Sequence, residues 1–382
     1  MAYQKLIISE KHQHKVGRLQ KGLVVSMVNW NKVRENYAKW WDKELDRPLI
    51  AVRLWGKDPG RPMPDVPSLT QATCADLSIP AEDIIDRLDY DLSCVEYLGD
   101  AFPYVSLTSF GPGVVAAFLG AKLDNSSGRV WFHPEKLLPI NEIHLEYDPD
   151  NIWLHRIKDI CRAGMERWQG QVMIAMPDLG GVMDILSTFR PSENLLLDLY
   201  DEPEEVQRLV GEIHDLWIQF YEDINSVLQP VNPGYCDWAG IFSDKPGYVL
   251  QSDFSYMISP EFFDTFVKED IRKMCCKLDR TMYHLDGVGQ LNHLDSILEI
   301  EELDAVQWVP GDGRPSQREW PQVLQKIRAA GKNLQITEGI EGFDTVVGFL
   351  GTAKGLQVSW GGAVSERERF LEALRRYRVI NG

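Results

Sequence analysis

Short apolar runs alternate with amphipathic stretches along the last hundred residues of the chain. The predicted elements, in order, are a strand at 305–308, a helix at 317–330, a strand at 333–336, a helix at 342–350, a strand at 356–359 and a helix from about 365. Strands that are apolar almost throughout and that alternate with helices are typical of a parallel sheet. This part of the chain is therefore predicted to be α/β.

The same alternation extends upstream at longer intervals. The predicted strands are at 49–56, 92–98 and 172–178 and from 282, and the predicted helices begin near 81 or lie at 151–168, 192–200, 204–228 and 259–278. Ser259 and Pro260 supply a capping side chain and a favourable first residue for the last of these helices. At least seven strands over this length favour a closed (β/α)8 barrel, the TIM-barrel architecture, over an open sheet.

Two regions depart from this alternation. Residues 1–28 show no clear period and are predicted to form an arm, whereas Asn29 can cap a helix whose apolar positions include Trp30 and Tyr37. A stretch rich in glycine and proline near residues 100–150 is predicted to be a lobe inserted above the barrel. The resulting division is an N-terminal arm and helix at 1–45 and a barrel at 46–382.

Composition and charge exclude some classes of partner. The chain has 44% hydrophobic and 25% charged residues, as soluble globular proteins do. Its formal net charge of −17 repels nucleic acid and anionic membrane surfaces, so neither is an expected partner. The six cysteines form no C-x-x-C pair and are expected to be reduced. The N-terminal residues contain no signal core or membrane span, which leads us to expect a cytoplasmic protein.

The segment 281–287 carries the strongest candidate chemistry. A β-prone apolar entry leads to His284, Asp286 and then Gly287. Because residues i and i+2 of a strand point to the same face, the imidazole and the carboxylate are predicted to project together from the strand end. The pair could bind a metal, share a proton or hold a polar substrate group. Alternatively, Asp286 caps the next helix and His284 only bonds to it.

Barrel enzymes build their sites at the C-terminal ends of the strands. Carboxylates and tryptophans occupy these predicted positions around one histidine. The candidate catalytic residues are His284, Asp286, Asp100 and Glu338, and the candidate substrate-binding residues are Arg53, Trp55, Asp178, Trp238, Trp308 and Trp360. Some of these acids are expected to be helix caps instead.

Two chemistries fit this set of side chains. His284, Asp286 and Glu338 could hold a divalent metal such as zinc through one nitrogen and two oxygens, which leaves a position open for a substrate. Without a metal, two carboxylates of different burial could act as acid and base while tryptophans stack on a flat or sugar-like substrate.

Several short segments together carry a family resemblance. They are Arg47-Pro48 before the first strand, 201–206 at the start of a long helix, Ser252-Asp253, 258–263 and 284–287. Over about residues 45–375 the chain resembles the uroporphyrinogen decarboxylase superfamily, which includes methyltransferases that move methyl groups to or from corrinoid proteins or thiols. The resemblance implies a (β/α)8 barrel, in agreement with the independent hydrophobic pattern.

The chain departs from both branches of this superfamily. The resemblance implies a second basic group after the first strand of a decarboxylase, but here Trp55 follows Arg53, so uroporphyrinogen is not an expected substrate. It also implies that the methyltransferases bind zinc through a histidine and two cysteines. His284 matches the histidine, whereas Asp286 and Trp360 stand where the cysteines are expected. An oxygen-rich site would suit an alcohol, ether or amine better than a thiol.

The leading hypothesis is a methyltransferase or demethylase for a small molecule, with or without zinc, that works with a corrinoid protein docked over the barrel mouth. A metal-free decarboxylase is the alternative, in which Arg53 clamps a carboxylate and Asp100 stabilises positive charge as carbon dioxide leaves. A glycoside-processing enzyme and a non-catalytic binding protein remain open. Besides the corrinoid protein, the partner considered is a second copy of the chain in a homodimer.

Overall fold

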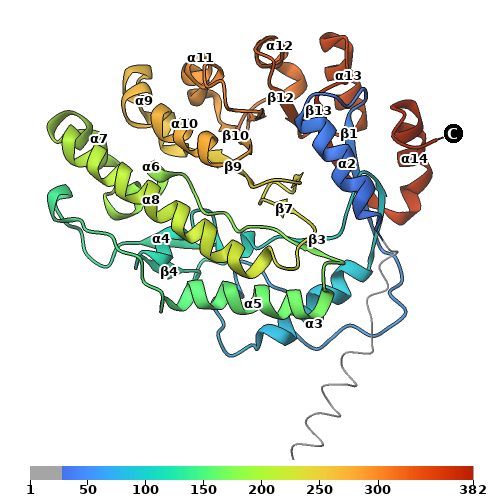
Figure 1. Ribbon diagram of the computed structural model, residues 1–382, viewed down its shortest axis with the longest axis horizontal. Helices are drawn as coiled ribbons and strands as arrows, with labels where there is room; N and C mark the ends of the chain where they lie inside the picture. The colour runs from blue at the N-terminus through green and yellow to red at the C-terminus, as the bar shows by residue number, and fades with distance from the viewer. Residues whose placement is uncertain (1–27, 382) are drawn as a thin grey trace, which may run out of the picture.

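A central sheet of seven strands organises the protein, whose residues 28–381 are described by a computed structural model (Figure 1). The strands are β1 (Leu49–Trp55), β2 (Val95–Gly99), β9 (Gly247–Gln251), β10 (Arg280–Asp286), β11 (Ala305–Val309), β12 (Asn333–Ile336) and β13 (Leu356–Ala363). Their order is β2-β1-β13-β12-β11-β10-β9, and every neighbouring pair is parallel except β1 and β2.

Helices follow the strands in the second half of the chain. They are α9 (Pro260–Phe266), α10 (Lys268–Lys277), α11 (Leu294–Leu298), α12 (Pro321–Ala329), α13 (Ile340–Leu350) and α14 (Arg367–Arg376). They succeed one another along the upper rim in Figure 1, outside the strands, so the alternation predicted for the last hundred residues is confirmed. The helix predicted at 259–278 is divided at Val267, although Ser259 caps its first half as expected.

The hydrogen-bonded ladder of the main sheet does not close into a ring within residues 28–381. Three short pairs in the described part of the chain are separate from it, namely β3 (Tyr104–Val105) with β6 (Met173–Ile174), β4 (Lys122–Asp124) with β5 (Trp131–His133) and β7 (Tyr235–Cys236) with β8 (Phe242–Ser243). A hydrogen bond of 2.8 Å from Met176 N to Cys236 O joins the segment just after β6 to β7. The fold is therefore a mixed α/β arrangement that is compatible with a TIM-like barrel. One strand of the main sheet, β9, is absent from the sequence prediction.

Helix α2 (Trp30–Trp41) packs against apolar side chains of the central sheet. Its start is fixed by Asn29, whose side-chain oxygen accepts a hydrogen bond of 3.1 Å from Lys32 N. Its buried residues are Val33, Tyr37, Trp40 and Trp41. These side chains share one apolar cluster with residues of β1, β9, β10 and β11. The predicted helix is confirmed, whereas the arm predicted before it lies outside the described residues apart from position 28.

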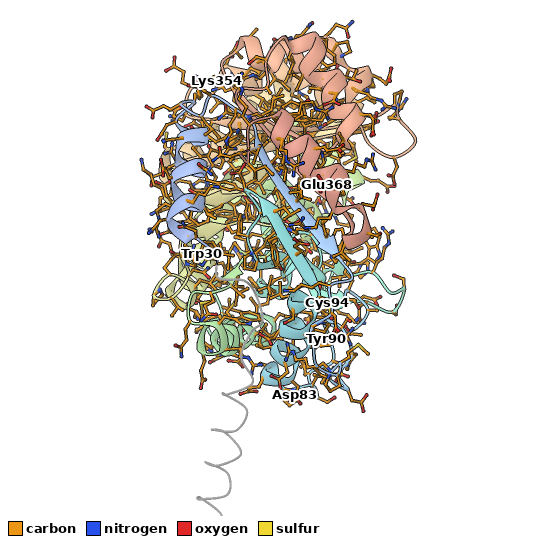
Figure 2. All side chains as sticks on the ribbon, turned by 90° about the vertical axis from the view of Figure 1, so that its right-hand side faces the viewer. Trp30, Asp83, Tyr90, Cys94, Lys354 and Glu368 are labelled. Atoms are coloured by element: carbon orange, nitrogen blue, oxygen red, sulfur yellow. The ribbon has the colours of Figure 1, made fainter. Side chains whose placement is uncertain are left out.

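Strand β2 runs antiparallel to β1 (Figure 2), so its end lies beside the beginning of β1. There Asp100 N donates to Ile50 O at 2.9 Å, and Asp100 Oδ2 accepts from Ile50 N at 3.1 Å. Arg47 holds the same carboxylate through two hydrogen bonds of 2.7 and 2.9 Å. This corrects the expectation that Asp100 lies at the C-terminal strand ends, because a strand that reverses direction delivers its last residues to the opposite edge.

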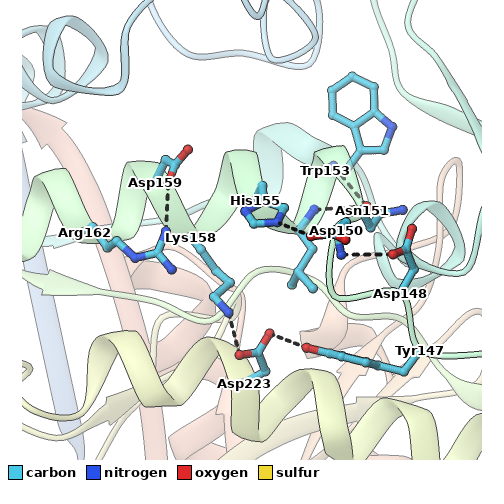
Figure 3. A network of polar contacts seen from close by, with 11 residues as sticks. Tyr147, Asp148, Asp150, Asn151, Trp153, His155, Lys158, Asp159, Arg162 and Asp223 are labelled. Carbon is cyan, nitrogen blue, oxygen red and sulfur yellow. Dashed lines mark hydrogen bonds and ion pairs between the residues drawn. The ribbon is translucent and has the colours of Figure 1, made fainter.

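The segment predicted as an inserted lobe leads into long helices that cover the lower part of the molecule in Figure 1. The regular elements here are α3 (Ala81–Ser93), α4 (Val115–Phe118), β4 (Lys122–Asp124), β5 (Trp131–His133), α5 (Ile152–Trp168), α6 (Val182–Phe189), α7 (Ser192–Asp201) and α8 (Pro203–Leu228). The Asp223 carboxylate of α8 accepts a hydrogen bond from the Tyr147 hydroxyl at 2.8 Å and pairs with Lys158 of α5 at 2.5 Å (Figure 3). The end of the lobe is thereby tied to both helices. Within residues 28–381, no helix combines the length and apolar character needed to cross a membrane.

The Asp100–Arg47 pair is expected to be structural. The Asp100 side chain is 1% exposed, and breaking a buried pair from one side typically costs about 3 to 5 kcal/mol. We therefore predict that Arg47→Ala lowers the free energy of unfolding by about 3 kcal/mol in a urea titration. Glu35→Ala, which removes a surface pair with Lys39, is the control and should have a much smaller effect. Equal effects of the two variants would contradict this assignment.

Candidate functional site

The ends of β9 and β10 bring together three side chains that can act as metal ligands: Asp253, His284 and Asp286. One donor atom of each lies within 4.8 Å of the other two, and His284 Nε2 is 3.8 Å from Asp286 Oδ2. Among residues 28–381, this is the one group of three or more histidine, cysteine or carboxylate side chains with such geometry. We refer to these three residues as the Asp–His–Asp cluster.

The backbone explains how the cluster forms. His284 pairs with Gln251 in the parallel ladder of β9 and β10, and Asp253 follows Gln251 by two residues. Asp286 lies two residues beyond His284, so its side chain leaves the same face of β10. Gly287 then turns the chain with φ +84°, a conformation that favours glycine, and its N–H donates to Val309 O at 2.8 Å.

A pocket of about 410 Å³ opens beside the cluster. Asp253 and Asp286 line it together with Tyr256, Asp312 and Arg314. Glycines at the turn after β10 let the Tyr256 ring lie against the backbone, since a Cβ on Gly289 would come within 2.7 Å of that ring. The pocket can therefore hold a small molecule next to the ligand atoms of the cluster.

A second hollow, of about 300 Å³, shares Asp253 with the first. Asp184 lies in its wall and accepts hydrogen bonds from Asp253 N at 3.0 Å and Phe254 N at 2.7 Å. Both bonds fix the turn that follows β9. The Asp184 carboxylate therefore positions the backbone that carries Asp253.

Burial and crowded carboxylates shift the protonation equilibria at this end of the sheet. Burial raises the pKa of Asp178 to about 6, and burial together with the charge of Asp253 raises the pKa of Asp184 to about 7. Burial by itself would lower the pKa of His284, but the neighbouring carboxylates of Asp286 and Asp253 outweigh it, and the pKa is raised overall. The site therefore has an excess of negative charge that a bound cation would reduce.

Two contacts orient the His284 ring. The ring of Trp238 meets it edge-on, with 5.1 Å between the ring centroids and an interplanar angle of 83°. On the other side, His284 Nδ1 is hydrogen-bonded to the side-chain oxygen of Gln307. Since an amide oxygen can only accept, Nδ1 carries the proton of the neutral ring, and the lone pair lies on Nε2, the atom nearest Asp286.

The structure brings together four of the predicted site residues: His284, Asp286, Trp238 and Asp178. The charge of Asp178 interacts with that of His284, which helps to keep the Asp178 pKa from rising further. Glu338, which we expected to be the third metal ligand, follows β12 at the same end of the sheet but is not in the cluster.

The carboxylate of Glu338 is used locally. Its Oε1 accepts a hydrogen bond of 2.8 Å from Arg318 N, which anchors the segment before α12. Within residues 28–381, the group whose geometry could hold a metal ion is therefore Asp253, His284 and Asp286, without the expected Glu338.

The tryptophans at the ends of β11 and β13 do not reach the cluster. Trp308 is fully buried against Trp320. Trp360 is also buried, and its indole N–H donates to the backbone oxygen of Glu338 at 3.2 Å. Both side chains belong to the apolar core between the sheet and its helices, on the opposite face of the strands from Gln307.

Arg53 and Trp55 lie at the end of β1, in a separate hollow of about 210 Å³. The Arg53 guanidinium stacks 4.0 Å from the centre of the Tyr104 ring. Asp100, its expected partner in a decarboxylase, is held by Arg47 instead. Arg53 and Asp100, the two residues expected to act together in a metal-free decarboxylase, therefore have different partners.

Sequence reasoning missed Asp253 and the glutamines beside His284. The signal for Asp253 was present, because the short apolar run of β9 ends in Gln251-Ser252-Asp253, a polar turn after a strand like the one after β10. The glutamines carry no such signal, since a glutamine inside a short strand usually points to solvent. Their alignment requires the register of the sheet.

No family model matches the chain, and no curated protein matches it in sequence. Among solved structures, it is similar to a methyltransferase from Methanosarcina mazei, with 12% sequence identity and a TM-score of 0.51. The match covers 82% of this chain and 96% of the other. At this identity the likeness concerns the fold alone, and it extends over most of both chains.

The raised pKa of Asp184 predicts a pH-dependent stability. In the folded protein this carboxyl keeps its proton up to about pH 7, whereas an unfolded aspartate loses it near pH 4. The folded state therefore loses stability as the pH rises through this window and no further above it. Relative to wild type, Asp184→Asn should gain on the order of 1 kcal/mol between pH 5 and pH 7 in urea titrations. A pH-independent difference between the two proteins would contradict the raised pKa.

Proposed function

We propose that the protein is a metal-dependent methyltransferase for a small molecule that binds in the pocket beside the Asp–His–Asp cluster. The observation that carries this proposal is the cluster itself, with one imidazole nitrogen and two carboxylate oxygens converging next to a pocket of about 410 Å³. The fold likeness to a methyltransferase supports the reaction class, because this fold accommodates methyl transfer in that protein. A (β/α)8 barrel, with β6 and β7 in its wall, is the architecture we assign to the site.

The donor set fits a divalent transition metal. His284 can offer Nε2, since its Nδ1 proton is engaged by Gln307. Asp253 and Asp286 add two hard oxygen ligands, and together they would neutralise a dication. Three protein ligands leave at least one position for substrate, as catalytic zinc sites do. Zinc is our first choice, and the oxygen-rich set also suits manganese or cobalt.

Each residue of the site then has a definite task. When bound, the metal would supply Lewis acidity toward the oxygen or nitrogen atom from which the methyl group departs. The cluster residues place that atom, and Trp238 keeps the imidazole plane fixed. The methyl carbon forms a bond to a nucleophilic acceptor while its bond to the heteroatom breaks, and the electron pair stays with the heteroatom. The proposed acceptor is the cobalt of a corrinoid carried by a partner protein, docked over the open side of the pocket.

The metal content of matched variants tests this proposal. Wild-type protein purified without a histidine tag should contain about one zinc, manganese or cobalt per chain by elemental analysis. Asp253→Asn, His284→Ala and Asp286→Asn should each lose most of it, because each removes one of only three ligands. Asp312→Asn is the control, since this carboxylate lines the same pocket outside the cluster.

The reaction class has its own readout. The metal-loaded protein should convert cob(I)alamin to methylcobalamin, followed by absorbance, with a methyl ether, alcohol or amine as the donor. The cluster variants should be inactive in this assay, and the surface variant Glu35→Ala should be active. A wild-type protein that is free of metal and still turns over would disprove the metal-dependent reading, and metal without methyl transfer would disprove the reaction class.

Arg314 adds a positive charge to a pocket whose other charged side chains are carboxylates. It lines the pocket with Asp253 and Asp286, yet no carboxylate within residues 28–381 forms an ion pair with its guanidinium. Its position is set by a tight turn, in which Arg314 N donates to Gly311 O at 3.2 Å. A guanidinium that has no ion pair within the described residues and lies beside a metal-type cluster suits a substrate that carries a carboxylate or another anionic group in addition to the methylated heteroatom.

We predict that Arg314 selects for such an anionic group. Methoxyacetate and the neutral methoxyacetamide form a matched pair of probes, and their affinities for the zinc-loaded protein can be compared by calorimetry. Arg314→Gln should weaken binding of the anion roughly 10- to 100-fold, the value of one charged hydrogen bond, and leave the amide unaffected. Equal losses for both probes would show that Arg314 only shapes the pocket.

A further inference from the structure

Polar side chains occupy one level of five neighbouring parallel strands. In register across the sheet, Gln251 of β9 lies beside His284 of β10, and the row continues with Gln307, Gln335 and Gln357. All four glutamines are buried. The residues one pleat earlier on β10 and β11 are the fully buried Met282 and Ala305, as expected of a barrel interior. A polar row directly above an apolar layer needs a specific reason, because each buried amide loses its hydrogen bonds to water.

Part of this row is a continuous chain of hydrogen bonds. The His284 ring bonds through Nδ1 to Gln307 Oε1, and Gln307 Nε2 donates to Gln335 Oε1. Gln335 Nε2 donates in turn to the backbone oxygen of Ala239, at 3.4 Å. Gln357 stands apart, since its Nε2 donates to Ser359 Oγ at 3.0 Å and its Oε1 has no partner within the described part of the chain.

The donors and acceptors in this chain of hydrogen bonds can be arranged in only one direction. The Ala239 carbonyl can only accept, so Gln335 must present its NH₂ group there and its oxygen to Gln307. Gln307 must then present its NH₂ group to Gln335 and its oxygen to the imidazole. Reversing any amide would place two oxygens, or two NH₂ groups, against each other. A backbone oxygen three links away therefore determines which nitrogen of His284 holds the proton.

We propose that Gln307 and Gln335 are positioning residues that decide the tautomer of His284, so that the neutral ring carries its proton at Nδ1 and its Nε2 lone pair faces Asp253 and Asp286. The metal consequence rests on the function proposed above, whereas the tautomer does not. Metal-bound histidines commonly donate their second N–H to a neighbouring acceptor, which orients the ring. Here the acceptor is the first of two buried amides, anchored on the backbone.

Amides suit this position better than carboxylates would. A carboxylate at position 307 would add a third negative charge next to Asp253 and Asp286 and would favour the imidazolium form of His284, which cannot bind a metal. A neutral amide fixes the tautomer without adding charge. Because Gln307 is 7% exposed and Gln335 is 5% exposed, water cannot easily replace either of them.

The tautomer can be measured directly in the metal-free protein. Protein labelled with ¹⁵N-histidine gives distinct nitrogen shifts for protonated and unprotonated ring positions, and His284→Gln identifies the His284 signals among the eight histidines. At a pH where the ring is neutral, we expect Nδ1 to show the protonated type and Nε2 the unprotonated type. Protonation at Nε2 in wild type would overturn the proposal without any variant.

Three variants separate positioning from packing. Gln307→Leu removes the acceptor, so the tautomer should shift toward protonation at Nε2 and zinc affinity should fall roughly 10- to 100-fold. Gln307→Glu keeps an acceptor and should retain the proton on Nδ1. Gln357→Leu changes a buried glutamine of the same row outside the chain and should leave both tautomer and zinc affinity as in wild type.

The outcomes also distinguish this proposal from the metal function. If wild type shows the expected tautomer but binds no metal, the amide chain stands and the metal function fails. If wild type binds zinc at the cluster while Gln307→Leu leaves the nitrogen shifts of His284 unchanged, the metal function stands and the positioning role is overturned. If Gln307→Leu does not fold, the nitrogen spectra of Gln307→Glu and Gln335→Leu test the positioning role instead. In Gln335→Leu the Gln307 amide can reverse, so part of the population should carry the His284 proton at Nε2.

Discussion

Parallel pairing of β9 to β12 is the constraint on which the rest of the structure depends. It sets His284 beside Gln307, and the two-residue repeat of β10 then sends Asp286 to the same side. A slip of one residue would turn both site residues outward and bring Tyr283 and Leu285 inside. Those two side chains are fully buried in the core between the sheet and its helices. The apolar core therefore enforces the geometry of the polar site, although the two occupy opposite faces of the same strand.

The contrast between two kinds of aspartate shows where chemistry can occur. Asp100 is buried, but a two-point contact with Arg47 and a backbone N–H use its acceptor capacity, so it has little left for a ligand. Asp253 and Asp286 lie close to the same histidine, and both carboxylates raise the pKa of its imidazole. These two carboxylates therefore have acceptor capacity left for a bound cation, and groups left unpaired in this way are commonly part of functional sites.

Part of the fold, and two of the three residues of the Asp–His–Asp cluster, could be predicted from the sequence. Hydrophobic periodicity predicted the strands and helices after residue 300, and the i, i+2 rule predicted that His284 and Asp286 project together from the end of their strand. The direction of β2 could not be read in this way, because a strand looks the same in either direction, and Asp100 was misplaced for that reason. Asp253 and the glutamine row depend on which strands are neighbours and in what register, and neither is a local property of the chain. Glu338 illustrates the opposite case. It follows a strand at the expected end of the sheet, but its carboxylate accepts a hydrogen bond from the backbone N–H of Arg318 and is not part of the cluster.

The net charge of −17 does not oppose an anionic substrate. Exposed charges are screened over about 8 to 10 Å at physiological salt, so a group inside the pocket responds mainly to its own walls. Once a dication neutralises the cluster, the remaining charges lining the pocket are Asp312 and Arg314, one of each sign. A substrate with an anionic group at one end and a methylated heteroatom at the other would then meet complementary groups at both ends, and its methyl group would lie between them. On the proposed function, the walls of the pocket would decide which molecule binds, whereas the acidic surface would affect mainly how fast it arrives.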